Sequence, residues 1–207
     1  NSVGLPLSMG YTSTIKNIGE MQNKGFEFGI DANPINGDFK WNINFNISFN
    51  KNTIKKLYNN QDILGGSLDV NLVQDYINIL REGQPVGRFW GYIEDGYDEK
   101  GQIKFKDMDG DKQITMKDKT YIGDPNPDFI YGLQSSMNYK NFELTFFIQG
   151  SYGNDIFNVS SINSTLDYGI GLNMPREVYL NHWTPDNVNS KYPILKVSTN
   201  VKASDRF

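Results

Sequence analysis

Residues 40–50 read KWNINFNISFN, and this stretch decides the fold class. Apolar side chains occupy every second position, and asparagine or serine fills the positions between them. Successive side chains of a β-strand point to opposite faces, so the stretch predicts a strand with one apolar and one polar face. About ten residues is also the length of a tilted strand that crosses a bilayer. The period alone leaves two interpretations open, a strand of a soluble sandwich and a strand of a transmembrane barrel.

The composition excludes several classes of protein. Hydrophobic residues make up 38% of the 207 residues, and no run approaches the roughly 18 apolar residues of a transmembrane helix. The net charge of -4 comes without a basic block, so nothing indicates nucleic-acid binding. Cysteine is absent, which excludes disulfides and thiol catalysis. Because the N-terminus has no signal-peptide pattern and the chain ends abruptly, we expect an internal fragment of a larger protein.

Two segments have the alternation expected of β-hairpins. The first, residues 24–50, contains Asn-Gly within residues 34–38, and this pair is typical of tight turns because both residues tolerate a positive φ. The second, residues 129–152, has room for a two-residue turn at Lys140 and Asn141. Each segment therefore predicts two antiparallel strands joined by a short turn.

If these strands cross a membrane, their apolar face meets lipid. The predicted lipid-facing residues are Trp41, Ile43, Phe45, Ile47, Phe49, Phe142, Leu144, Phe146 and Ile148. Phe147 breaks the polar face of the second hairpin, and Ser135 interrupts its apolar face. Aromatic residues at the strand ends suit the girdles that mark the two membrane interfaces. They are Trp41, Phe49, Tyr139 and Tyr152.

The connections between strands fall into two length classes. Two to five residues join the strands within each predicted hairpin, whereas residues 51–128 and 153–207 form long, polar connections. Outer-membrane barrels have short periplasmic turns and long extracellular loops, and soluble sandwiches rarely separate the two in this way. We therefore predict an all-β fold, a portion of a large antiparallel transmembrane β-barrel.

Residues 107–118, DMDGDKQITMKD, place aspartates at positions 1, 3, 5 and 12 of a calcium-binding loop. Hard cations need several oxygen ligands, which alternating aspartates supply. Lys112 stands where such a loop has glycine, and the last position holds aspartate in place of a longer glutamate. A calcium site and an acidic turn without metal both stay open. The predicted ligands are Asp107, Asp109, Asp111, Gln113 and Asp118.

Aromatic residues in the long connections are candidates for substrate contacts, namely Trp90, Tyr92 and Trp183. Aromatic rings pack under loops more often than they bind ligands, so packing is the commoner explanation. The single histidine, His182, has no nucleophile or paired base in a recognisable motif. The sequence therefore predicts no enzyme.

Taken in order, these segments resemble the late barrel of SusC/RagA-type TonB-dependent outer-membrane transporters. The resemblance implies that residues 1–207 are part of such a barrel, without the plug domain that precedes it. It is carried by NKGFEFGIDANPINGDFKWNINFNISFNKNTI, EGQPVGRFWGY, FKDMDGDKQIT, YIGDPNPDFIYGL, YKNFELTFFIQGSYGNDIFN and HWTPDN.

The resemblance also implies a function. The chain is similar to proteins that import oligosaccharides or peptides across the outer membrane. In such proteins a SusD-like lipoprotein lies over the barrel, and the TonB complex supplies the energy. The TonB complex would act through segments that lie outside these residues. The family's DxNGDG turn appears here with Lys112 in place of the second glycine. A secreted calcium- and glycan-binding β module is the alternative that the residues leave open.

Overall fold

The computed structural model describes residues 2–4, 13–15, 19–70, 73–166, 169, 171–197 and 200–207. Most of the regular structure consists of antiparallel β-strands. The chain divides into two compact units, each built from three segments. The hairpin unit comprises Asn1–Ile63, Leu80–Val86 and Pro127–Gly153, and the loop unit comprises Leu64–Ile79, Gly87–Asn126 and Asn154–Phe207.

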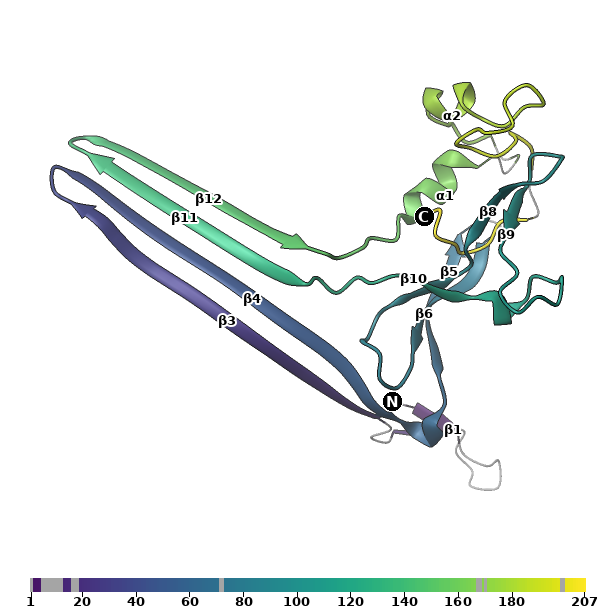
Figure 1. Ribbon diagram of the computed structural model, residues 1–207, viewed down its shortest axis with the longest axis horizontal. Helices are drawn as coiled ribbons and strands as arrows, with labels where there is room; N and C mark the ends of the chain where they lie inside the picture. The colour runs from purple at the N-terminus through teal and green to yellow at the C-terminus, as the bar shows by residue number, and fades with distance from the viewer. Residues whose placement is uncertain are drawn as a thin grey trace. The chain divides into compact units, whose positions relative to one another are not determined.

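The hairpin unit contains a sheet of four long strands that run side by side in Figure 1. Their order across the sheet is β12-β11-β4-β3, so that β4 and β11 pair in the middle and β3 and β12 form the edges. The strands are β3 (Gly19–Asn36), β4 (Phe39–Leu57), β11 (Phe129–Tyr139) and β12 (Phe142–Tyr152). Two short strands, β1 (Ser2–Gly4) and β2 (Ser13–Ile15), pair separately.

Both tight turns lie within the segments in which the sequence predicts them. The second lies at Lys140 and Asn141 as predicted, with Lys140 at a φ of 53°. The first consists of Gly37 and Asp38, within the predicted residues 34–38, and neither Asn36 nor Gly37 has a positive φ. Pro34 lies inside β3, where the register shifts between Ala32 and Ile35. An edge strand tolerates proline at such an irregularity, so the hairpin continues past it.

Strand β4 is longer than the sequence pattern indicates. The prediction that a connection begins at residue 51 is wrong at its start, because the β3–β4 register continues to the pair Gly19 and Leu57. Alternation of apolar and polar side chains stops near Asn50, but backbone pairing does not depend on it. The end of the strand is held by hydrogen bonds between Ile54 and the backbone of residues 83–84, of 2.8 and 2.9 Å.

The loop unit contains regular structure that the pattern did not predict. Its main sheet has the order β10-β7-β6-β5, formed by β5 (Ile63–Val70), β6 (Val73–Leu80), β7 (Phe89–Gly91) and β10 (Thr120–Gly123). A second pair consists of β8 (Glu94–Tyr97) and β9 (Ile103–Phe105). Two short helices follow, α1 (Val159–Thr165) and α2 (Arg176–Leu180). Among the described residues, no helix has the length and hydropathy needed to span a membrane.

A hydrophobic core holds the loop unit together. Residues 200–207 close this core. The Tyr92 N–H donates to the Ala203 carbonyl at 2.9 Å, and the Asp205 N–H donates to the Tyr92 carbonyl at 3.1 Å. Gly91 allows this approach, since a Cβ there would lie 2.6 Å from the Ala203 oxygen. The core residues are Leu68, Val73, Tyr92, Ile103, Phe105, Ile162, Leu166, Val201, Ala203 and Phe207.

Candidate functional site

One face of the hairpin sheet is apolar across all four strands. Residues paired across antiparallel strands point to the same face. Phe45 of β4 pairs with Ile30 of β3 and with Leu133 of β11, which in turn pairs with Ile148 of β12. The register places all nine predicted lipid-facing residues on this face, which we call the apolar face. They are Trp41, Ile43, Phe45, Ile47, Phe49, Phe142, Leu144, Phe146 and Ile148.

The apolar face is exposed. Phe142 is 80% exposed, Leu144 59% and Ile148 49%. A soluble domain buries such a face against a second layer, because a large exposed apolar surface drives association. The exposure therefore points to a surrounding that is not water, although contact of these residues with lipid stays a prediction.

An aromatic row crosses the apolar face far from the tight turns, at the ends of β11 and β12 and within β3 and β4. Its four rings come from the four strands in order, at centroid separations of 6.5, 5.6 and 5.2 Å. They are Phe26, Phe49, Phe129 and Tyr152. A second row, Phe39, Tyr139 and Phe142, lies beside the tight turns. Aromatic residues thus bound the apolar face at both ends.

A polar contact is enclosed within the apolar face. The Trp41 Nε1–H donates to the Ser135 hydroxyl at 2.9 Å, and Ser135 is only 3% exposed. An indole N–H needs a partner when water is excluded, and the serine that interrupts the apolar pattern provides it. The interruption seen in the sequence is therefore a matched pair rather than a defect.

The opposite face is polar and hydrogen-bonded. Asn44 Nδ2 donates to Asp31 Oδ2 at 3.1 Å, and Asn42 Nδ2 donates to Asn33 Oδ1 at 3.1 Å. The Ser48 hydroxyl lies 3.3 Å from a carboxylate oxygen of Glu27. These bonds link β4 to β3 side chain by side chain, so the asparagine series reinforces the pairing of the strands.

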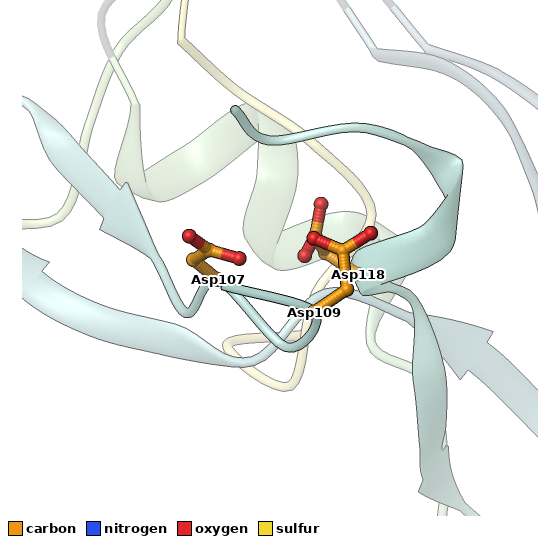
Figure 2. A group of neighbouring side chains, drawn as sticks. All are labelled: Asp107, Asp109 and Asp118. Atoms are coloured by element: carbon orange, nitrogen blue, oxygen red, sulfur yellow. The ribbon is translucent and has the colours of Figure 1, made fainter. Parts of the chain in front are cut away.

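The acidic turn brings together three of the predicted metal ligands. Figure 2 shows Asp107, Asp109 and Asp118, whose carboxylates offer oxygens within 4.8 Å of one another. Asp111 does not belong to this group, and its Oδ1 accepts the Gln113 N–H at 2.8 Å. Lys112 has a φ of 65°, so the backbone adopts the left-handed bend of a calcium loop without the glycine.

Backbone donors already occupy most of these carboxylates. Asp107 accepts N–H bonds from Gly110 and Lys112 at 2.6 and 2.7 Å. Asp118 accepts from Thr115 and Met108 at 2.7 and 2.8 Å, and these bonds lower the pKa of its carboxyl. The hydrogen bonds account for the turn without a cation. Calcium binding therefore stays a prediction, and titration calorimetry of wild type and Asp109→Ala measures it directly.

The three candidate substrate-binding aromatics do not form one platform. Tyr92 is 5% exposed and belongs to the core, where burial together with the carboxylates of Asp75 and Asp118 raises its pKa to about 12. Trp90 packs edge-on against Tyr121 at 5.2 Å. Trp183 is 7% exposed but lines a pocket. The core position of Tyr92 leaves no open ring face for substrate, whereas the substrate contacts of Trp90 and Trp183 stay predictions.

A buried polar cluster in the loop unit has no counterpart in the sequence-based predictions. The Arg206 guanidinium donates to a carboxylate oxygen of Glu94 and, at 2.8 Å, to the Tyr97 hydroxyl. Burial raises the pKa of the Glu94 carboxyl, while Arg206 opposes the shift. The partners lie more than 100 residues apart, so no local sequence pattern indicates this cluster.

Comparison with known proteins places the chain within longer sequences. It is 36% identical over 206 residues to TonB-dependent receptor P3 of Formosa agariphila, covering 91% of this chain and 20% of that protein. It is 32% identical over 166 residues to TonB-dependent receptor SusC of Bacteroides thetaiotaomicron, covering 76% of this chain and 16% of SusC. The chain thus spans about a fifth of the length of these curated relatives. No family model matches it.

A solved structure shares the fold. The RagAB peptide transporter aligns with a TM-score of 0.74 at 22% identity, over 93% of this chain and 21% of the transporter chain. At this identity the likeness concerns the fold. It shows that the antiparallel sheets described above correspond to one part of a much larger protein.

Proposed function

Since the chain belongs to the SusC/RagA-type TonB-dependent receptors, of which it spans about a fifth, we propose that it forms part of the wall and the outer loops of a transport barrel. TonB-dependent receptors are outer-membrane β-barrel proteins that act as transporters and not as enzymes. The proposed activity of the whole protein is the TonB-dependent import of oligosaccharides or peptides.

The bounded, exposed apolar face is the observation that carries this proposal. Phe39 and Phe49 on β4 are ten residues apart, as are Phe129 and Tyr139 on β11. Ten residues of strand rise about 34 Å, and a tilt of about 40° reduces this to roughly 26 Å along the membrane normal. The lipid-facing band of an outer-membrane barrel is about 25 Å tall and is flanked by aromatic girdles. The two aromatic rows match both properties.

The remaining features fit the same position. In the proposal, the turns at Gly37–Asp38 and Lys140–Asn141 face the periplasm, and the long connections that follow β4 and β12 leave the membrane on the extracellular side. The polar face then meets the hydrated lumen or the plug. The edge strands β3 and β12 continue the barrel by pairing with strands from the rest of the protein, because an unpaired edge is not tolerated in lipid.

The proposed partners follow from the relatives. RagAB is a peptide importer. From the likeness to this family, the partner expected here is a SusD-like surface lipoprotein. The TonB complex supplies energy through segments that lie outside these residues. Peptides and oligosaccharides are both retained as substrate classes, because the family likeness does not distinguish them.

Transport by the full-length receptor tests the proposal. Deletion of the gene should abolish growth on, and uptake of, one peptide or oligosaccharide class, and loss of TonB should have the same effect. Normal uptake of every such nutrient by the deletion strain would contradict the proposed activity.

Solubility tests the membrane position separately. Residues 1–207 produced alone should require detergent, because their apolar face is exposed. A stable, detergent-free monomer with cooperative unfolding would favour the secreted calcium- and glycan-binding module instead.

A further inference from the structure

A pocket of about 820 Å³ opens between the end of β8 and the loop that follows α2. One wall is formed by residues 95–99 and the other by Trp183, Pro185 and residues 188–190, all within the loop unit. This volume lies in the range of small-molecule pockets. We propose that this pocket binds the ammonium group of a lysine-containing peptide, and we call it the acidic pocket. The inference rests on the proposed import function, since it selects one substrate class, cationic peptides, from the two proposed above.

The residues that line the acidic pocket carry negative charge, which favours a cationic ligand. Three carboxylates line the pocket, Asp95, Asp98 and Glu99, and none of its lining residues is lysine or arginine. Lys104 pairs with Asp95 at 3.9 Å, between side chains that are 48% and 66% exposed. This pair offsets part of the charge of Asp95, so Asp98 and Glu99 supply most of the negative charge of the pocket. A cleft lined by one sign of charge attracts a ligand of the opposite sign.

Asp98 holds a fixed position within this wall. Its Oδ1 accepts the N–H groups of Gln102 and Lys100 at 2.8 and 2.9 Å. The Gly101 N–H closes the same turn on the Asp98 carbonyl at 3.0 Å. The carboxylate is therefore oriented before any ligand arrives, which reduces the entropy cost of binding.

The opposite wall is suited to the apolar stem of a lysine. Trp183 is held against the Asp98 turn, since a Cβ at Gly101 would lie 2.4 Å from its ring. Pro185 and Val188 extend this wall, and Val188 is 54% exposed. A lysine side chain combines four methylene groups with a terminal charge. The apolar wall matches the stem of the lysine, and the carboxylates match its charge.

A neighbouring pocket has cationic residues in its lining, so the preference for a cationic ligand is limited to the acidic pocket. A second pocket of about 560 Å³ shares Gly96, Tyr97 and Ser190 with the acidic pocket, but its lining includes Arg206 and Lys191. That lining holds these two cationic side chains and one carboxylate, Glu94, and Lys191 also pairs with Glu177 at 2.8 Å. A cationic group is therefore favoured on only one side of Tyr97. A neutral oligosaccharide would gain nothing from this division of charge.

Binding to the purified full-length receptor in detergent tests the inference without depending on import. The probe is N-acetyl-Ala-Lys-Ala-amide, measured by titration calorimetry at low salt. The same peptide with acetyl-lysine keeps the stem and removes the charge. Ala-Ala-Ala-amide carries its ammonium at the N-terminus and separates that source from the side chain. We expect the lysine peptide to bind at least tenfold more tightly than its acetylated form.

Paired substitutions locate the site. Asp98→Asn with Glu99→Gln removes two charges, and the amide oxygen introduced by Asp98→Asn can still accept the turn hydrogen bonds. This variant should weaken binding of the lysine peptide about tenfold, the effect of losing one charge-assisted contact. Asp186→Asn, in the same exposed loop but outside the lining, should leave the affinity unchanged. An unchanged circular dichroism spectrum confirms that each variant is folded.

Three outcomes would overturn the inference. They are equal binding of the lysine and acetyl-lysine peptides, equal affinity of the double variant and wild type, and absence of binding to the wild type. Tighter binding of Ala-Ala-Ala-amide than of the lysine peptide would assign the pocket to a peptide N-terminus and overturn the lysine assignment. Because uptake is assayed separately, a receptor that imports nutrients but fails these tests refutes the acidic pocket alone.

Discussion

The hairpin unit and the loop unit use apolar residues in opposite ways. In the loop unit they form an interior, where Ile162 and Ala203 are fully buried. In the hairpin unit they form an exterior, where Phe142 is 80% exposed. In the proposed membrane position, a single chain thus folds for two different solvents. Apolar side chains gain free energy by leaving water, whereas side chains that face lipid need no cover.

Removal of a core side chain from the loop unit should have the largest effect. Ile162→Ala should destabilise that unit by about 2–5 kcal/mol, because a fully buried isoleucine leaves a cavity. Hydrogen exchange of the Tyr92 and Phe105 amides in the full-length receptor measures this change. Ile156, which is 80% exposed, is the matched control, and Ile156→Ala should change stability by less than about 0.5 kcal/mol. Equal effects at both positions would mean that burial of Ile162 does not stabilise the loop unit.

Introduction of a charge into the apolar face of the hairpin unit should have the second-largest effect on stability. Phe45 lies midway between the aromatic rows, so Phe45→Arg should cost about 2–4 kcal/mol of folding free energy in lipid vesicles. Asn44→Arg, one residue away on the polar face, should cost little. Equal costs at these neighbouring positions would mean that the apolar face does not meet lipid.

The Trp41–Ser135 contact sharpens the comparison further. Ser135→Ala leaves the indole N–H without its acceptor, at a cost of about 1–3 kcal/mol where water is excluded. The control is Ser136→Ala on the exposed polar face, which should stay within about 0.5 kcal/mol. The double variant Trp41→Phe with Ser135→Ala should lose less than the sum of the two single changes, measured in vesicles. Strict additivity would contradict the coupling.

The smallest effect should appear only in acid and only in the loop unit. Hydrogen bonds from Thr115 and Met108 lower the Asp118 pKa, so this carboxylate stabilises the fold above its unfolded pKa of about 4. The contribution is lost as the pH falls from there through the folded pKa. Asp118→Asn should flatten this part of the stability profile, which thermal unfolding from pH 6 to pH 2 measures. An unchanged acid profile in the variant would exclude Asp118 as its source.

The sequence alone predicted the hairpins better than the loops for a physical reason. Alternation with period two follows from the contrast between two faces, and residues 39–49 and 129–152 have this contrast throughout most of their length. Strand β4 continues to Leu57 after the contrast ends, and so its last pairs with β3 left no trace in the pattern. The short strands β7 to β9 depend on contacts made elsewhere in the unit.

The candidate sites also differ in how far apart their residues lie in the sequence, and this decides which of them could be predicted. Asp107, Asp109 and Asp118 lie close in sequence, and a turn was enough to bring them together. Glu94 and Arg206 meet across 112 residues, and the acidic pocket joins segments nearly 90 residues apart. No local pattern encodes such pairings, because they depend on the packed core.

The hydrogen bonds between Tyr92 and residues 203–205 join two segments that lie on either side of the second hairpin in the sequence. Closure of the loop interior therefore closes a chain loop on the order of 100 residues long, which has a large entropy cost. Contacts of such long range form late in folding. Protease resistance at Tyr92 would report this step separately from formation of the two hairpins.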